Sequence, residues 1–289
     1  MDARDHDQRT PLMAAAEHGA TACATLLLAR FGDGGGEQLG MVDHFGHSAT
    51  HYACSTNHHS TLDLLLDAGA SMTARDAFRQ TPLMAAAERG ATNCVMMLLG
   101  RLENDEVGEQ LGMVDNHGNA AAHLACHFNH HSTLALLRGA GASMDSPNND
   151  GRTPLLVAAE YGAAACVTLL LDPLVHDVGE QLGMVDNDGD STAHLAPCFN
   201  HPSTLALLLN AGALMDARNN SGLTPLMMAA VDDGAVDCMM LLSESAYALD
   251  LDAQGNDGST ALHQAAYYGH PQIVSLLLDA GADPTIQNL

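Results

Sequence analysis

Histidine and cysteine recur at short spacing along this chain, and both residue types can bind a metal ion. The first such stretch runs from His51 through Cys54 to the adjacent pair His58 and His59. Imidazole nitrogens and thiolates are ligands that zinc prefers in proteins, so a zinc site is the chemistry that this spacing could support. The pattern returns at His123, Cys126, His130 and His131, and in part at His194, Cys198 and His201.

Sequence motifs of the common classes of enzyme active site are absent from the sequence. It contains no phosphate-binding loop, no glycine-rich dinucleotide turn and no nucleophile elbow. Residues 34–36 are three glycines, but they follow a helical pattern rather than a strand, so we expect a flexible loop there. The carboxylates are scattered over predicted turns and helix ends, which is typical of a solvated surface. We therefore predict that the chain is not an enzyme, has no catalytic residues and carries no cofactor.

The elements that position these residues are set by a long internal repeat. The motif Thr-Pro-Leu-Met/Leu begins at Thr10, Thr81, Thr153 and Thr224, with intervals of 71, 72 and 71 residues. A second motif, Gly-Glu-Gln-Leu-Gly-Met-Val-Asp, begins at residues 36, 108 and 179 on the same period. Repetition on this scale is typical of a stacked-repeat protein, in which each unit packs only on its neighbours.

Each long period divides into two units, so that eight units fill the chain. The second half of a period opens on a weaker form of the motif, at Ser48, Ala120, Ser191 and Thr260. We treat residues 1–289 as a single repeat domain and residues 1–9 as the tail of a preceding unit. We therefore expect the chain to be a segment of a longer array or a truncated gene product. The predicted repeats are 10–43, 48–76, 81–115, 120–150, 153–186, 191–220, 224–256 and 260–289.

The local chemistry of one unit predicts two helices joined by a turn. Thr10 is a good N-cap and Pro11 suits the first helical position, so we expect a helix over residues 12–17 that stops near Gly19. A second helix follows, in which Cys23, Leu26 and Leu27 occupy one face. Neither helix could bury its apolar face alone, so neighbouring units must stack.

The last unit carries the sequence of a known family most completely. Residues 257–266, Asp-Gly-Ser-Thr-Ala-Leu-His-Gln-Ala-Ala, are followed by Gly269-His270, Ile273-Val274, residues 276–278 (Leu-Leu-Leu) and Gly-Ala-Asp at 281–283. This unit resembles the ankyrin repeat, and the resemblance extends over the whole chain. It implies an all-α, ankyrin-repeat solenoid built of helix–turn–helix units with hairpin-like fingers.

The chain departs from the family pattern at several positions. Thr50, Ala122 and Ala193 replace the first-helix leucine, and Ala120 replaces the threonine cap. A missing cap costs about 1 kcal/mol, so we expect looser packing and easier local opening there. The Gly-Glu-Gln-Leu-Gly-Met-Val-Asp motif lengthens three of the fingers and is expected to add a longer loop or an extra helical turn.

The resemblance also offers structural roles for the histidines and cysteines. His51, His123, His194 and His263 occupy the position of a histidine that forms structural hydrogen bonds in the family, while Cys54 and Cys126 occupy an inner alanine position. Asn57, Asn129 and Asn200 stand where the family has a turn glycine, which asparagine can replace in the left-handed region. This leaves only His58, His59, His130 and His131 as surface histidines without a role, and we predict no bound metal. Cys23, Cys94, Cys166 and Cys238 should be core residues of the second helices, and no disulfide is expected.

Composition limits the possible partners. The formal net charge is −25, from 35 acidic residues against ten arginines and no lysine. Such a surface should repel phosphate backbones and anionic lipid, so we expect a protein partner with a basic or neutral surface rather than nucleic acid. No secretion signal and no apolar run of 18 residues occurs, so membrane insertion is not expected. Seven cysteines suit a reducing compartment, and we predict a cytoplasmic monomer, with a nuclear location left open.

The resemblance implies that the fingertips and first helices line a concave, partner-binding groove. The predicted function is therefore that of a protein–protein interaction scaffold; the alternative is a targeting array of a larger enzyme or membrane protein. Aromatic side chains, which are scarce in this chain, concentrate at these positions and are the type that anchors interfaces. The predicted fingertip contacts are His44, Phe45, His47, Phe78, Gln80, His117, Asn119, Asp188, Asp190 and Leu223. The predicted first-helix contacts are His18, Arg89, Phe128, Tyr161, Phe199, Tyr267 and Tyr268.

Overall fold

The computed structural model of the protein describes residues 4–31, 35–172, 178–232, 235–244 and 249–289. Helices connected by turns make up these ranges, and the described residues contain no strand beyond an isolated bridge between Val185 and Ser191. The predicted all-α class is therefore confirmed. None of the described helices is long and apolar enough to cross a bilayer. The chain divides into two compact units, residues 1–143 and 144–289.

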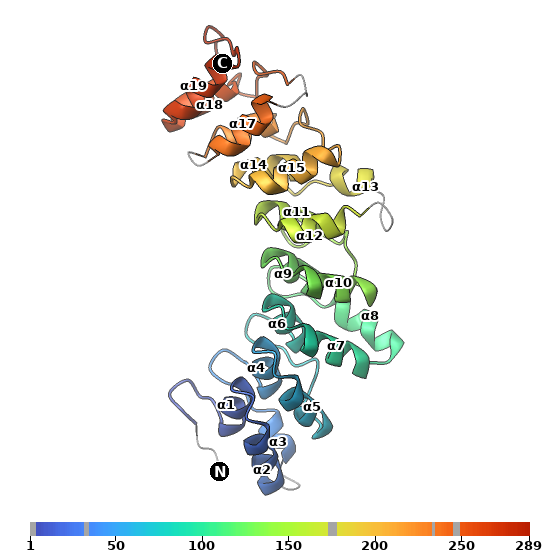
Figure 1. Ribbon diagram of the computed structural model, residues 1–289. Helices are drawn as coiled ribbons and strands as arrows, with labels where there is room; N and C mark the ends of the chain where they lie inside the picture. The colour runs from blue at the N-terminus through green and yellow to red at the C-terminus, as the bar shows by residue number, and fades with distance from the viewer. Residues whose placement is uncertain (1–3, 32–34, 173–177, 233–234, 245–248) are drawn as a thin grey trace. The chain divides into compact units, whose positions relative to one another are not determined.

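The first unit stacks four helix pairs in chain order (Figure 1). Its inner helices pack side by side in the order α1, α4, α6, α9, and its outer helices in the order α2, α5, α7, α10. The inner helices are α1 (Pro11–Glu17), α4 (Ala49–Ser55), α6 (Pro82–Glu88) and α9 (Ala121–His127). The outer helices are α2 (Thr21–Phe31), α5 (His59–Asp67), α7 (Thr92–Arg101) and α10 (His131–Gly139).

The second unit repeats this arrangement, with α11, α14, α16 and α18 packed in sequence beside α12, α15, α17 and α19. Its inner helices are α11 (Pro154–Glu160), α14 (Thr192–Cys198), α16 (Pro225–Ala229) and α18 (Ala261–Tyr268). Its outer helices are α12 (Ala164–Leu170), α15 (Pro202–Asn210), α17 (Val236–Glu244) and α19 (Pro271–Asp279).

The inner helices begin as the sequence predicts. The hydroxyl of Thr10 accepts a hydrogen bond from Met13 N at 3.2 Å, and Pro11 occupies the first helical position. Gly19, just past the end of α1, has φ +63°, a conformation that suits glycine. In α9, which begins after Ala120, the Ala120 N–H donates to His123 Nδ1 at 3.1 Å, but no side-chain oxygen caps the helix. The predicted left-handed asparagines are confirmed, with φ values of 59° at Asn57, 57° at Asn129 and 52° at Asn200.

The core lies between the inner and outer layers, but the predicted apolar face of α2 is wrong. Cys23 is exposed and Leu26 is 72% exposed, whereas Ala24 is buried. The equivalent Cys94 is buried, and its Sγ lies 3.5 Å from the carbonyl of Ala53 in the preceding pair. No described helix pair precedes α2, so this face of α2 meets water.

The Gly-Glu-Gln-Leu-Gly-Met-Val-Asp motif forms extra helices rather than extended loops. These are α3 (Gly35–Leu39), α8 (Asn104–Gly112) and α13 (Val178–Gly183). The flexible loop expected at residues 34–36 is therefore wrong for Gly35 and Gly36, which begin α3, while Gly34 lies outside the described residues. The glutamine of each motif is buried, at Gln38, Gln110 and Gln181.

The fingers between pairs share one turn chemistry. Asp43 Oδ1 accepts hydrogen bonds from the backbone N–H groups two and four residues later, those of Phe45 at 2.8 Å and His47 at 2.7 Å. Asp76 does the same for Phe78 and Gln80. Adjacent fingers are joined by a backbone hydrogen bond, such as that from Ala77 N to Phe45 O at 2.9 Å. The side-chain oxygen of this residue thus fixes the turn, and asparagine supplies it in the fingers that begin at Asn148 and Asn219.

Candidate functional site

A groove of about 350 Å³ opens on the inner face of the first unit. Its base is α4, which packs between α1 and α6 and contributes Tyr52 and Ser55, with Thr56 as its C-cap. The flanking helices and the fingers before α4 and α6 complete its walls. The other lining residues are Glu17, Phe45, His47, His51, Gln80, Ala85, Glu88 and Arg89.

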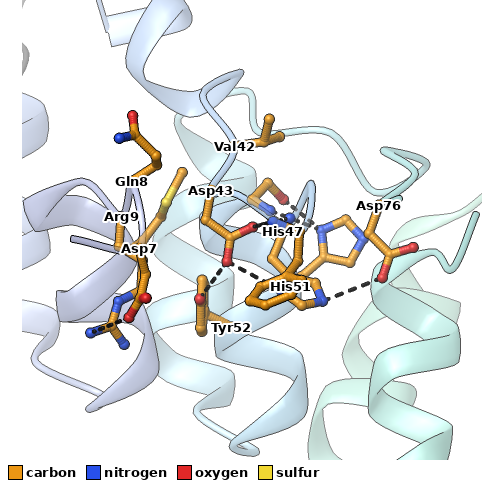
Figure 2. Close-up of polar contacts among 12 residues, drawn as sticks. Asp7, Gln8, Arg9, Val42, Asp43, His47, His51, Tyr52 and Asp76 are labelled. Atoms are coloured by element: carbon orange, nitrogen blue, oxygen red, sulfur yellow. Dashed lines mark hydrogen bonds and ion pairs between the residues drawn. The ribbon is translucent and has the colours of Figure 1, made fainter. Parts of the chain in front are cut away.

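A histidine between two carboxylates organises the finger side of the groove (Figure 2). His47 Nδ1 lies 3.3 Å from Asp43 Oδ2, and His47 Nε2 lies 3.3 Å from Asp76 Oδ2. The carboxylates of Asp43 and Asp76 are almost fully buried, whereas the imidazole is about one-third exposed. Tyr52 donates its hydroxyl proton to Asp43 Oδ2 at 2.7 Å, which ties α4 to the finger before it.

This arrangement favours ionised carboxylates and a charged imidazole. The contact with Asp76 raises the pKa of His47 above its ordinary value, against the effect of burial, and Asp43 adds to the rise. Burial opposes ionisation of Asp43, but hydrogen bonds from Tyr52 and from the His47 N–H outweigh it and lower the pKa of Asp43. The pKa of Asp76 is likewise lowered, because His47 and the Gln80 N–H outweigh burial.

A second histidine joins the same two repeats from inside. His51 Nδ1 lies 2.8 Å from the hydroxyl of Ser48, and His51 Nε2 lies 3.1 Å from the carbonyl of Gln80 in the next finger. Burial lowers the pKa of His51, so the neutral ring is favoured there. The structural role that the family resemblance implies for His51 and His194 is thus confirmed, since His194 Nε2 contacts the carbonyl of Leu223 at 3.1 Å.

The open side of the groove combines an aromatic face with carboxylates. Phe45 is 49% exposed. The centroid of its ring lies 5.5 Å from the ring centroid of His44 and 6.0 Å from that of His47. Glu17 accepts from Arg9 Nη1 at 2.9 Å. Glu88 accepts from Gln80 Nε2 at 3.3 Å and pairs with Arg89 Nε at 3.4 Å. An aromatic surface edged by charge can hold both the apolar stem and the polar end of a partner side chain.

The structure brings four of the predicted contact residues to this groove, namely Phe45, His47, Gln80 and Arg89. The remaining predicted residues of the first unit lie outside its lining. His18, His44, Phe78, His117 and Phe128 are exposed, and Asn119 is half-buried beside Asp115.

The predicted contact residues of the second unit differ in how exposed they are to solvent. Tyr161, Asp188, Phe199, Tyr267 and Tyr268 are exposed, and Leu223 is half-buried. Tyr267 and Tyr268 line a hollow of about 520 Å³, with ring centroids 5.0 Å apart in an edge-to-face arrangement.

The expectation that Asp190 is a solvent-accessible tip residue is wrong. Its side chain is buried at 8% exposure and accepts a hydrogen bond from Asn219 Nδ2 at 2.7 Å. Burial raises the pKa of Asp190 despite this bond. The next finger, which supplies Asn219, covers the carboxylate.

Sequence reasoning missed Glu17, Tyr52 and Glu88 in the groove. The two glutamates belong to the carboxylates expected at solvated helix ends, yet each ends the repeated sequence Ala-Ala-Ala-Glu one residue before a predicted contact, His18 or Arg89. That fixed position was the signal in the sequence. Tyr52 offered none, because its place in the groove depends on how α1 and α6 flank α4.

Two of the histidines left without a role prove to be structural. His130 Nε2 lies 3.1 Å from the carbonyl of Glu88 in the preceding inner helix, and the equivalent His201 and His270 contact the carbonyls of Glu160 and Val231. His58 packs so closely on Gly19 that a Cβ added at Gly19 would overlap the Nδ1 atom of His58. His59 and His131 are exposed, as predicted. In the described part of the chain, no three histidine, cysteine or acidic side chains gather to hold a metal ion.

Comparison with known proteins agrees with this architecture. The family profile described as "Ankyrin repeats (3 copies)" matches residues 1–76, 60–146, 133–219 and 193–288. The human B-cell lymphoma 3 protein is 30% identical over 236 residues, which cover 81% of this chain and 50% of that protein. A transient receptor potential cation channel subfamily A member 1 homolog from Caenorhabditis elegans is 33% identical over 183 residues, covering 63% of this chain and 14% of the channel. The chain thus spans half or less of the length of these two relatives.

A solved structure shows the same fold. The crystal structure of the human ASB11 ankyrin repeat domain matches with a TM-score of 0.64 and 26% sequence identity, over 83% of this chain and all of that domain. The profile matches extend over nearly the whole sequence, and paired helices occur throughout both units. The chain therefore belongs to the ankyrin-repeat family.

Proposed function

We propose that this protein is a protein–protein interaction scaffold whose partner occupies the inner groove of the first unit. Ankyrin repeats are generally modules for binding proteins, and the observation that carries the proposal is the half-exposed Phe45 in a groove whose polar wall is held by His47. A rigid aromatic beside a preorganised wall costs little entropy to bury, and such residues anchor interfaces. No catalytic role is proposed.

The proposed contact surface extends from the groove along the fingers. Phe78, at the next fingertip, is 52% exposed, and His44, His117 and Phe128 are also accessible. In the second unit, Tyr161, Asp188, Phe199, Tyr267 and Tyr268 form a further proposed set, with Leu223 partly accessible. The net charge of −25 favours a basic or neutral protein surface over nucleic acid, and we expect the scaffold to act as a cytoplasmic monomer.

Affinity capture tests this function. Wild-type protein, Phe45→Ala and Phe78→Ala are immobilised and incubated with native lysate from the source cells. Both substitutions should weaken the retention of a partner that the wild type binds, and Phe45→Ala should weaken it more strongly. Met96→Ala is the matched control, since Met96 is 51% exposed on the outer helix α7. Equal retention by wild type and Phe45→Ala would contradict the proposal.

The runner-up function is a targeting array of a larger enzyme or membrane protein. The observation that favours it is that the matched nematode channel is covered over only 14% of its length. In that case the same groove would position a catalytic or membrane domain. Sequencing the gene on both sides of the region that encodes residues 1–289 tests this. We expect the open reading frame to continue into such a domain. A start codon at the upstream end together with a stop codon at the downstream end would contradict this alternative.

A further inference from the structure

We infer that the groove of the first unit receives an arginine side chain of the protein partner, with the guanidinium stacked on Phe45 and paired with Glu88. This inference rests on the proposed function and deepens it by naming the chemistry of the contact. It follows from the charge around the groove, from the partners that each carboxylate already has, and from the exposed aromatic face.

The groove carries an excess of negative charge that its own cations do not balance. When the described lining residues are taken together with the ion-pair network that extends from them, two arginines and His47 stand among six carboxylates. The carboxylates are Asp5, Asp7, Glu17, Asp43, Asp76 and Glu88. An added cation would therefore be attracted, whereas an anionic group would be repelled.

Most of these carboxylates already form hydrogen bonds or ion pairs within the protein. His47 and the backbone N–H groups of the fingers hold Asp43 and Asp76. Arg9 divides its charge among Asp5 at 2.8 Å, Asp7 at 3.7 Å and Glu17 at 2.9 Å. Arg9 is thus shared by three carboxylates and cannot fully balance Glu17.

Glu88 is the carboxylate with the weakest internal partners. Its contacts to Arg89 at 3.4 Å and to Gln80 at 3.3 Å are both long, and the Arg89 side chain is 62% exposed. The Glu88 side chain itself is 22% exposed, so it is accessible from the groove yet partly shielded from water. A planar guanidinium can form two parallel hydrogen bonds to such a carboxylate, which neither of its present partners does.

Phe45 supplies the second half of the contact. A guanidinium stacks on an aromatic face while its methylene stem covers apolar surface, and arginine does this more often than lysine. An aliphatic side chain would cover Phe45 but would desolvate Glu17 and Glu88 without pairing them, which is unfavourable. Arginine therefore satisfies both features of the groove.

The test uses fluorine NMR of protein labelled with 4-fluorophenylalanine. The chain has five phenylalanines, so five signals are expected, and the Phe45 signal is assigned by its loss in Phe45→Leu. The probe is N-acetyl-arginine amide, and N-acetyl-citrulline amide is its uncharged isostere. We expect a saturable shift of the Phe45 signal with arginine, at a dissociation constant of roughly millimolar, and none with citrulline. An equal response to citrulline, a stronger response to N-acetyl-lysine amide, or no saturable shift would overturn the inference.

Two substitutions with opposite expected effects make the test specific. Glu88→Gln should weaken binding of N-acetyl-arginine amide roughly two- to fivefold, and Arg89→Ala should strengthen it because it removes the competing cation. Glu109→Gln is the control, since Glu109 is exposed on α8 and the same charge is removed outside the groove. Equal weakening by Glu88→Gln and Glu109→Gln would indicate general attraction and would also overturn the inference. A partner that depends on Phe45 but shows no response to N-acetyl-arginine amide would contradict this inference and leave the proposed function standing.

Discussion

His47 Nε2 lies 3.3 Å from Asp76 Oδ2 and thereby joins the finger before α4 to the finger before α6. The other ring nitrogen lies 3.3 Å from Asp43 Oδ2 in its own finger. A neutral imidazole carries one proton and can donate to only one of these carboxylates. The geometry therefore favours the doubly protonated ring, and deprotonation would leave one buried carboxylate facing a nitrogen lone pair.

This relationship predicts a pH-dependent contribution to stability. The pKa of His47 is raised in the folded state, so its stabilising effect is complete below the ordinary value of 6.5 and is lost as the pH rises through the folded value. We expect the difference in unfolding free energy between wild type and His47→Gln to shrink over that window, measured by urea unfolding at a series of pH values. His194 has a lowered pKa and acts in the opposite direction, but it does not depend on His47, so its contribution is the same in both proteins and cancels.

The control for this prediction is Asp76→Asn, followed by NMR titration of the His47 ring. Contact with Asp76 is the largest cause of the raised pKa, so the titration midpoint should fall in this variant. A midpoint that does not change would show that the two fingers are not coupled through His47.

The adjacent residues His130 and His131 form a matched pair for stability measurements. His130 contacts the carbonyl of Glu88, whereas His131 is exposed at the start of α10. We expect His130→Ala to lower the unfolding free energy by about 1–2 kcal/mol and His131→Ala to change it by less than about 0.5 kcal/mol. Chemical denaturation of both variants checks this, and equal effects would contradict the structural role of His130.

Arg79 occupies a turn position that is glycine in six other fingers, and its φ is +64°. Those glycines are Gly46, Gly118, Gly151, Gly189, Gly222 and Gly258. A non-glycine residue is disfavoured in this region, so Arg79→Gly should stabilise the protein by about 1 kcal/mol in thermal or urea unfolding.

Gly46→Ala makes the opposite kind of change at the equivalent position of the preceding finger. A Cβ added there would lie 2.7 Å from Ala77 N. This substitution should destabilise the protein, because both the backbone conformation and the contact with the next finger are unfavourable. A loss of stability in Arg79→Gly would show that the arginine side chain compensates for its own strain.

The missing cap at Ala120 predicts a weak point at the start of α9. Serine or threonine occupies the equivalent positions Ser48, Ser191 and Thr260, so a hydroxyl fits there. Ala120→Thr should stabilise the protein by about 1 kcal/mol, and hydrogen exchange in α9 should slow. Thr81→Ala, which removes a cap present at α6, should destabilise by a similar amount. Unchanged exchange in α9 would show that the bond from His123 N to the carbonyl of Ala120 already satisfies this helix end.

Cysteine labelling tests whether the face of α2 that carries Cys23 is exposed. All seven cysteines lie in the described residues, and Cys23 is the exposed one among them. Burial raises the pKa of Cys198 to about 11 and of Cys238 to about 12, which slows their reaction further. We expect one rapidly reacting thiol per chain at neutral pH, lost in Cys23→Ser. Rapid labelling that persists in Cys23→Ser would contradict the exposed face of α2.

The fold could be predicted from the sequence because each repeat contains the residues that begin and end its own helices. Thr10 and Pro11 begin a helix, Gly19 ends it, and the same phrase returns at fixed intervals. What could not be predicted depends on neighbours that are distant in sequence. His130 reaches a carbonyl 42 residues earlier, and Asp190 is covered by Asn219 from the following finger.

The groove was predicted in part for the same reason. Family position indicated Phe45, His47, Gln80 and Arg89, but the glutamates beside them became relevant only when α1, α4 and α6 were packed together. Likewise, Cys23 has the sequence context of Cys94 and differs only in whether a helix pair lies against it. Local sequence thus determines the element, and the stack determines which of its faces are buried.

Photo-crosslinking at the groove tests the central claim most directly. The captured partner is mixed with protein that carries p-benzoyl-phenylalanine at position 45 or, as the control, at position 96 on the outer helix α7. Partner binding in the inner groove predicts an efficient crosslink from position 45 and little from position 96. A crosslink from position 96 without one from position 45 would contradict the account.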